Sequence, residues 1–153
     1  MSVKSKTKNF VYFFLNRLNW FWRILGVDGL PVLMYHSIAD NQVFFTIKPE
    51  IFAMQMDYLA KNNYQTIFAS ALPPLLASGQ ALPAQTVVLT FDDGYADFYE
   101  NAFPILKKYN LKTTVFLATD FVGGRMNNHQ GQPLKILSWP QIKELAKSSQ
   151  VEF

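Results

Sequence analysis

Short apolar runs alternate with longer amphipathic segments from about residue 30 to the end of the chain. Such runs, bounded by Gly, Pro or polar residues, are typical of β-strands. The pattern predicts strands at residues 30–35, 64–68, 86–91 and 113–118, and the start of another at 151–153. Residues 86–91 (TVVLTF) contain only apolar and β-branched side chains, as expected of a strand covered on both faces.

The segments between these runs are predicted to be helices, at residues 72–77, 49–61, 100–109 and 139–147. The helix at 49–61 opens with proline and glutamate, which favour a first helical turn, and its large apolar residues fall on one face. Asn101 is a candidate cap for the third helix. Ser138 and Gln141 have the spacing of a capping box at the start of the fourth.

Strands that alternate with helices predict an α/β fold with a parallel sheet, either open or closed into a barrel. The count is four strands and the beginning of a fifth, which is fewer than a closed (β/α) barrel needs. An open sheet is also compatible with this count. We therefore expect residues 29–153 to form one α/β domain and residues 1–28 a separate N-terminal segment.

The N-terminal segment combines basic and aromatic residues. Five Lys and Arg side chains and no acid lie within residues 1–25, which leaves nine basic and eleven acidic side chains in the rest of the chain. The pI of about 9.1 therefore reflects the N-terminus, and nucleic acid is not an expected partner of the domain. On a helix, residues 10–25 place Phe10, Phe14, Leu18 and Phe21 on one stripe. This predicts an amphipathic helix that binds a membrane surface.

Other interpretations of residues 10–25 remain open. The segment is too broken by Asn and Arg to be a clear membrane-spanning helix. A secretory signal peptide has a similar basic leader, but the apolar run is short and no A-x-A-like cleavage site follows. The helix could also pack its aromatic face on the domain or on another subunit.

The main chemical candidate is Asp92-Asp93-Gly94, directly after the strand at 86–91. Catalytic groups of parallel α/β folds collect at the carboxyl ends of strands. Two adjacent carboxylates repel each other, so a divalent cation there would relieve the conflict. The chain has no cysteine, so any metal must be bound by Asp, Glu or His. A plain alternative is that Asp93-Gly94 is only a turn and Asp93 caps the following segment.

Several segments together resemble the polysaccharide deacetylase (NodB-homology) family. They are residues 88–95 (VLTFDDGY), 101–109 (NAFPILKKY) and 113–117 (TTVFL). Upstream, residues 31–38 (PVLMYHSI) resemble the strand of family members that act on cell-surface N-acetylglucosamine polymers. The resemblance covers roughly residues 30–153.

The resemblance implies a partial (β/α) barrel and a hydrolase that removes N-acetyl groups from N-acetylglucosamine residues of a polysaccharide in the cell envelope. It implies zinc or another divalent ion as cofactor, Asp92 as general base and Asp93 as metal ligand. His36 and Tyr95 would line the same pocket, although a lone His after a strand is more often a structural residue. A cytoplasmic location is the alternative.

The family's His-x-x-x-His pair, which supplies the other metal ligands, is expected beyond residue 153. His129 has no second His at ligand spacing and is interpreted as a loop residue. We therefore expect a chain truncated after four to five strands, with weak metal binding. The alternatives are a non-catalytic, membrane-associated remnant or binding module of the same fold, and an open-sheet phosphotransfer or nucleotide domain. The last lacks any Gly-rich phosphate loop.

Overall fold

A parallel sheet of five strands forms the centre of the computed structural model, which describes residues 29–79, 85–127 and 131–153. The strands are β1 (Val32–Tyr35), β4 (Gln65–Ile67), β5 (Thr86–Phe91), β6 (Thr113–Val115) and β9 (Val151–Glu152). They follow the order β1-β5-β6-β9, and β4 also pairs with β5. Every pairing in this sheet is parallel. The predicted α/β fold with a parallel sheet is confirmed, and the predicted helix at 10–25 lies outside the described residues.

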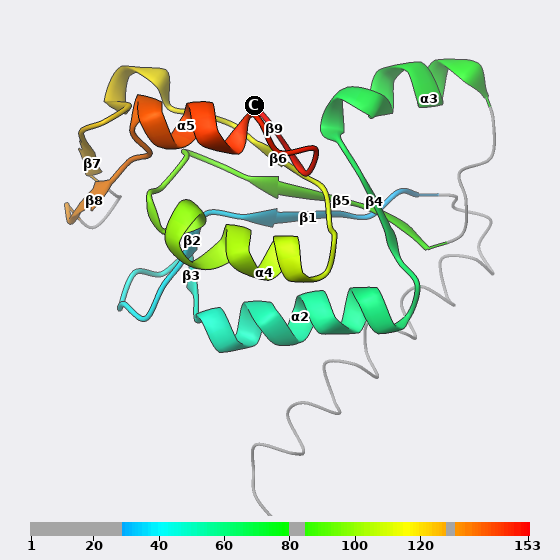
Figure 1. The fold of residues 1–153 in the computed structure, drawn as a ribbon, viewed down its shortest axis with the longest axis horizontal. Coiled ribbons are helices and arrows are strands. Elements are labelled where there is room, and N and C mark those ends of the chain that lie inside the picture. The colour runs from blue at the N-terminus through cyan, green and yellow to red at the C-terminus, as the bar shows by residue number, and fades with distance from the viewer. Residues whose placement is uncertain (1–28, 80–84, 128–130) are drawn as a thin grey trace, which may run out of the picture. The chain divides into compact units, whose positions relative to one another are not determined.

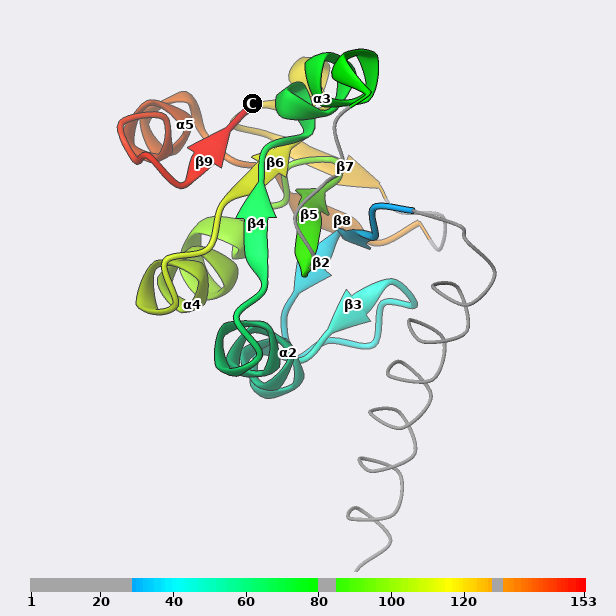
Figure 2. The same cartoon turned by 90° about the vertical axis from the view of Figure 1, so that its right-hand side faces the viewer.

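Helices connect successive strands, as a parallel sheet requires. They are α2 (Pro49–Lys61), α3 (Leu72–Ser78), α4 (Phe103–Lys108) and α5 (Trp139–Leu145), with shorter helical turns η1 (Ala69–Ala71), η2 (Phe98–Ala102) and η3 (Thr119–Phe121). Helices α2, α4 and α5 lie on one side of the curved sheet (Figures 1 and 2). Within the described ranges, none of these helices is long and apolar enough to cross a membrane.

Side chains alternate between the two faces of the central strands. The odd-numbered residues of β1 and β5 face the helices, where Phe91 is fully buried. Its ring lies 5.3 Å from that of Tyr35, 5.7 Å from that of Phe52 and 4.7 Å from that of Phe98. This aromatic cluster joins β1 and β5 to α2 and η2, and it fixes the position of the residue that precedes Asp92.

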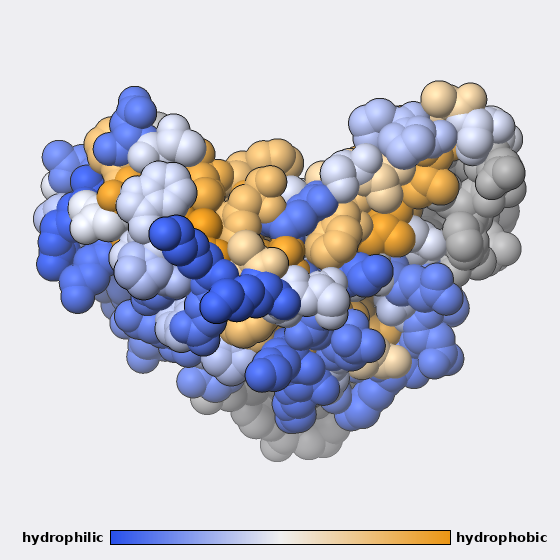
Figure 3. Space-filling view, turned by 45° about the horizontal axis from the view of Figure 1, so that its top comes forward, coloured by the Kyte–Doolittle hydropathy of each residue, from blue (hydrophilic) through white to orange (hydrophobic). Residues whose placement is uncertain are grey.

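Even-numbered residues of β1, together with Phe116 directly after β6, form an open apolar face on the other side of the sheet. Val32, Met34 and Phe116 on this face are 50%, 61% and 52% exposed. Figure 3 shows a hollow with a hydrophobic floor in this part of the surface. Parallel sheets are normally covered on both faces; here β5 is buried on both faces, whereas Val32, Met34 and Phe116 beside it stay exposed.

Two short strand pairs lie outside the main sheet. Strands β2 (Ser37–Ile38) and β3 (Thr46–Ile47) are parallel, and β7 (Arg125–Asn127) pairs with β8 (Pro133–Lys135) in antiparallel fashion. The sequence pattern predicted none of these strands.

The prediction that Asn101 caps a helix is wrong. Residues Phe98–Ala102 form a π-helical turn that continues into α4, so Asn101 lies inside a helical segment. Its side-chain amide donates to the carbonyl of Ile38 at 2.7 Å. The capping box at Ser138 is confirmed, because Gln141 Oε1 accepts the Ser138 amide at 2.9 Å.

Glu152 links β9 to β6 and to the helical turn η1. Its carboxylate accepts hydrogen bonds from the backbone and side chain of Ser70 and, at 2.6 Å, from Thr114 Oγ1. Thr114 Oγ1 in turn accepts the amide of Ala69 at 2.9 Å. Burial alone would raise the pKa of Glu152, but these hydrogen bonds hold it below its usual range. The segment after β4 is thus fixed against β6 and β9.

Replacing Glu152 with glutamine is expected to lower the free energy of unfolding by about 1 kcal/mol at neutral pH, because charge-assisted hydrogen bonds to a partly exposed group are lost. A depressed pKa stabilises the fold above the unfolded pKa of about 4.3. That contribution disappears as the pH falls through the folded value. Urea unfolding at neutral and acidic pH should therefore show a difference that shrinks below about pH 4.

A Ser70→Ala variant and the double variant complete this test. Because Ser70 and Glu152 share their hydrogen bonds, the two substitutions should be less than additive. Full additivity, or an effect independent of pH, would show that the carboxylate does not hold this segment.

Candidate active site

The turn after β5 presents two carboxylates at the end of the sheet. The Asp92 amide still donates to the Tyr35 carbonyl at 2.9 Å, as a continuation of the β1–β5 ladder. Asp93 and Gly94 then adopt φ angles of 69° and 73°, in the left-handed region that is costly for a residue with a side chain. The Asp93 carbonyl accepts the Ala118 amide at 3.3 Å, and the Gly94 carbonyl accepts the Leu137 amide at 2.9 Å. Three neighbouring segments thus hold the turn in one conformation.

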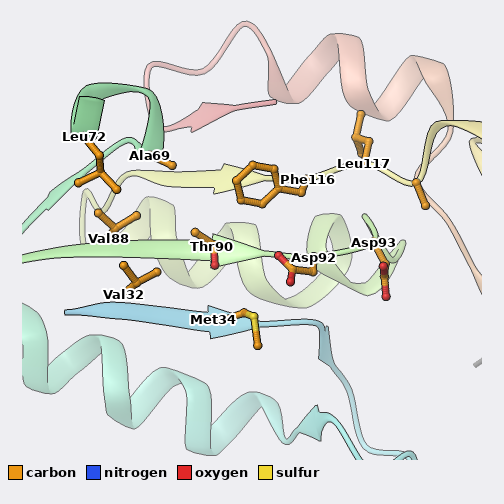
Figure 4. Close-up of a pocket in the computed structure, with 11 residues that line it drawn as sticks. Val32, Met34, Ala69, Leu72, Val88, Thr90, Asp92, Asp93, Phe116 and Leu117 are labelled. Atoms are coloured by element: carbon orange, nitrogen blue, oxygen red, sulfur yellow. The ribbon is translucent and has the colours of Figure 1, made fainter. Parts of the chain in front are cut away.

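Asp92 and Asp93 line a pocket of about 560 Å³. Its other walls are largely apolar and come from β1, β5 and the segments that follow β4 and β6; they include Val32, Met34, Leu72, Val88 and Phe116. Figure 4 shows the Asp92 side chain over the end of β5. The Asp93 side chain, at the turn, points away from the end of β5. The two acids therefore present their carboxylates to different parts of the same site.

His36 stands beside Asp92. Its Nε2 atom lies 4.0 Å from Asp92 Oδ2, and the two side chains are 26% and 31% exposed. The imidazole ring also packs on Phe45, with centroids 5.2 Å apart. His36 contacts one of the two acids but does not itself line the 560 Å³ pocket.

A buried aspartate that the sequence pattern did not reveal anchors the segment after His36. Asp97 accepts hydrogen bonds from Ser37 Oγ at 2.6 Å and from the Ile38 amide at 3.0 Å. Burial raises the pKa of Asp97, although these two hydrogen bonds act in the opposite direction. Asp97 lies five residues after Asp92 on the same connection, so it ties His36 to the turn that carries the acids.

Tyr95 supports the turn from inside the protein. Its side chain is 2% exposed, and its ring stacks on Phe45 with centroids 5.6 Å apart. Burial raises the pKa of Tyr95, and the negative charge of the nearby Asp93 carboxylate raises it further. Tyr95 lies behind the acids and does not form part of the pocket wall.

The pocket environment makes Asp92 more basic than an ordinary aspartate. Partial burial raises the pKa of Asp92; attraction to His36 offsets part of this rise, and repulsion by Asp93 adds to it. A carboxylate with a raised pKa is a better proton acceptor near neutral pH. Such shifts are common at catalytic sites, where burial and like charges are brought together.

The sequence of this chain is similar to the sequences of several known proteins. Residues 79–153 match the polysaccharide deacetylase family. The chain is 41% identical over 132 residues to the poly-β-1,6-N-acetyl-D-glucosamine N-deacetylase of Staphylococcus aureus. The matched region covers 86% of this chain and 44% of the relative. It is 36% identical over 118 residues to YxkH of Bacillus subtilis, covering 77% and 39%. The chain belongs to the polysaccharide deacetylase family.

A solved structure of this family extends the comparison to the fold. IcaB from Ammonifex degensii superposes with a TM-score of 0.71 and 34% identity, covering 82% of this chain and 51% of IcaB. The chain thus spans about half the length of the relatives it matches, or less. Its parallel sheet corresponds to part of a deacetylase domain.

Polysaccharide deacetylases are generally metal-dependent, but the described residues do not form a complete metal site. A catalytic zinc takes three protein ligands. Among residues 29–79, 85–127 and 131–153, no group of three His, Cys, Asp or Glu side chains could hold a metal ion. Asp93, with its carboxylate at the turn, is a suitable single donor, whereas Asp92 and His36 contact each other. His129 lies outside the described residues.

Proposed function

We propose that this chain is part of a hydrolase that removes N-acetyl groups from N-acetylglucosamine residues of a polysaccharide. The observation that carries this proposal is Asp92, which lines a pocket next to a second acid and a histidine and has a raised pKa. The names of relatives from Staphylococcus aureus and Escherichia coli, both poly-β-1,6-N-acetyl-D-glucosamine N-deacetylases, support the substrate class.

In this proposal Asp92 is the general base. Its carboxylate accepts a proton from the water that attacks the acetamide carbonyl carbon, and a tetrahedral intermediate forms. Breaking the carbon–nitrogen bond then requires a proton on the departing nitrogen, which the protonated Asp92 returns. The products are acetate and a free amine on the sugar. The apolar walls of the pocket would limit the water around the carboxylate and keep its pKa raised.

We also propose that Asp93 is a ligand of a divalent metal ion, with zinc the expected ion, and that the other ligands come from outside the described residues. Tyr95 lies close enough to Asp93 for this carboxylate to raise the Tyr95 pKa, and a neighbouring hydroxyl group can orient a carboxylate that binds a metal. The described residues alone do not complete this site, so metal binding by the chain should be weak.

The open apolar face supports the proposal that this sheet is the first part of a larger, barrel-like domain. Its exposed Val32, Met34 and Phe116 side chains would be buried if further strands and helices covered them. Catalysis should then require these additional elements. A suitable test protein joins residues 1–153 to the part of IcaB from Ammonifex degensii that the chain does not match; we call this protein the completed domain.

Acetate release by the completed domain tests the proposed function. With β-1,6-linked N-acetylglucosamine oligomers, we expect one free amine for each acetate released, measured by an enzymatic acetate assay and amine labelling. Chitin oligomers, which are β-1,4-linked, test which linkage the site accepts. A folded completed domain that releases acetate from neither polymer would refute the proposal.

A non-catalytic binding module of the same fold is the second candidate. It is favoured by the lack of a three-ligand metal group among the described residues. A module of this kind would bind N-acetylglucosamine oligomers without releasing acetate, even as the completed domain. The assay above therefore separates the two candidates.

We propose that residues 10–25 associate with a membrane surface and that the protein acts in the cell envelope. The support is the amphipathic sequence pattern and the five basic residues within positions 1–25, as in helices that lie in a membrane interface. Flotation of the full chain with anionic vesicles, compared with a chain that lacks residues 1–28, tests this association. Equal flotation of both proteins would contradict it.

A further inference from the structure

Thr90 is a polar residue among the apolar side chains that line the pocket. It is 6% exposed, and it lines the pocket together with Val32 and Val88. Valine has nearly the same shape as threonine and is equally suited to a buried strand. A hydroxyl group that is removed from water costs free energy unless it is hydrogen-bonded. Packing alone therefore does not explain a threonine at this position.

The hydroxyl group of Thr90 differs from those of two neighbouring threonines. Thr113 Oγ1 donates to the Leu89 carbonyl at 3.0 Å. Thr114, which lies opposite Thr90 in the β5–β6 register, donates to Glu152 at 2.6 Å. In the part of the chain that the structure describes, no residue forms a hydrogen bond with Thr90 Oγ1. The Thr90 hydroxyl is thus available to a molecule in the pocket.

Thr90 and Asp92 project from the same face of the sheet. Side chains alternate along a strand, so residues two positions apart share a face, and the Asp92 amide continues the ladder by donating to the Tyr35 carbonyl. Both residues line the pocket, and Figure 4 shows the Thr90 side chain on β5 directly before that of Asp92. Two residues of a strand span about 6.6 Å, a gap that one water molecule can bridge by hydrogen bonds to both side chains.

We propose that Thr90 is a further catalytic residue, whose hydroxyl group holds the water molecule that Asp92 activates. This inference rests on the proposed function. Asp92 accepts one proton of the water, and the second proton stays on the oxygen and is donated to Thr90 Oγ1. A lone pair of the same oxygen then forms the bond to the acetamide carbon. Two hydrogen bonds fix the direction of this attack, and a fixed orientation of the reacting groups lowers the barrier.

Acetate release by the completed domain separates this role from packing. Thr90→Val replaces the hydroxyl with a methyl group, so kcat should fall about three- to tenfold with KM unchanged. Thr90→Ser keeps the hydroxyl and should restore most of the rate. Because no described residue is a partner of this hydroxyl, Thr90→Val should not lower the midpoint of urea unfolding of the full chain.

Thr113→Val is the matched control. Thr113 is also a buried strand residue, but it does not line the pocket, and its hydroxyl donates to the Leu89 carbonyl. Its substitution should lower the midpoint of urea unfolding, because a buried hydrogen bond is lost, and should leave kcat unchanged.

Three results would overturn the role of Thr90. They are a wild-type kcat in Thr90→Val, a loss of stability in this variant equal to that of Thr113→Val, or a change in KM alone, which would assign the hydroxyl to the sugar instead of the water. A wild-type completed domain that releases no acetate refutes the proposed function and the role of Thr90 with it. Acetate release that Thr90→Val leaves unchanged refutes only the role of Thr90.

Discussion

Replacing Asp92 with asparagine is expected to lower acetate release by the completed domain by about 10²- to 10⁴-fold, the usual contribution of a general base. Asparagine has nearly the same shape as aspartate but cannot accept the proton from water. The rate is the quantity to compare, with substrate at saturation, and the fold should persist because the Asp92 side chain is 31% exposed.

The control for this prediction is Asp120→Asn. Asp120 is an exposed aspartate in η3, and it takes no part in the proposed chemistry. Its substitution should leave the rate unchanged. Wild-type turnover by the Asp92→Asn variant would show that Asp92 is not the general base.

Replacing Gly94 with alanine is expected to lower the free energy of unfolding by about 2–3 kcal/mol. Two effects add. Gly94 has a φ of 73°, which is strained for alanine, and an added Cβ would lie 2.6 Å from Leu117 Cδ2. Because Leu117 also lines the pocket, its displacement should lower activity as well. Chemical denaturation measures the stability change.

Gly79→Ala is a matched control for this substitution. Gly79 has a similar φ of 64°, but nothing lies within 4 Å of an added Cβ. It should cost only the backbone strain, about 1–2 kcal/mol. Equal destabilisation by both variants would show that the contact with Leu117 is unimportant.

The elements that could be predicted from the sequence are those whose signals are local. The strand at 86–91 and the helix at 49–61 have the predicted bounds, because one is buried on both faces and the other begins with Pro49. The strand predicted at 113–118 ends at Val115, since its partner β5 ends at Phe91. The length of a strand thus depends on a neighbour that the local pattern does not reveal.

The acids of the candidate site could also be located from sequence, because Asp92 and Asp93 directly follow the clearest strand. Their surroundings could not. Phe45 packs between His36 and Tyr95, and Asp97 accepts hydrogen bonds from residues about sixty positions earlier. Such contacts depend on how distant segments come together in the fold. The predicted roles of Asp92 and Asp93 stay predictions, whereas His36 and Tyr95 lie beside the acids and outside the wall of the pocket they were predicted to line.

The charge coupling at the end of β5 can be measured without any catalysis. NMR titration of the Asp92 carboxyl in the full chain, in the wild type and in Asp93→Asn and His36→Gln variants, reports it directly. Partial burial raises the pKa of Asp92, attraction to His36 lowers it, and repulsion by the neighbouring Asp93 raises it. The account therefore predicts a lower Asp92 pKa in Asp93→Asn and a higher one in His36→Gln. An Asp92 pKa that neither substitution moves would contradict the existence of a shared site.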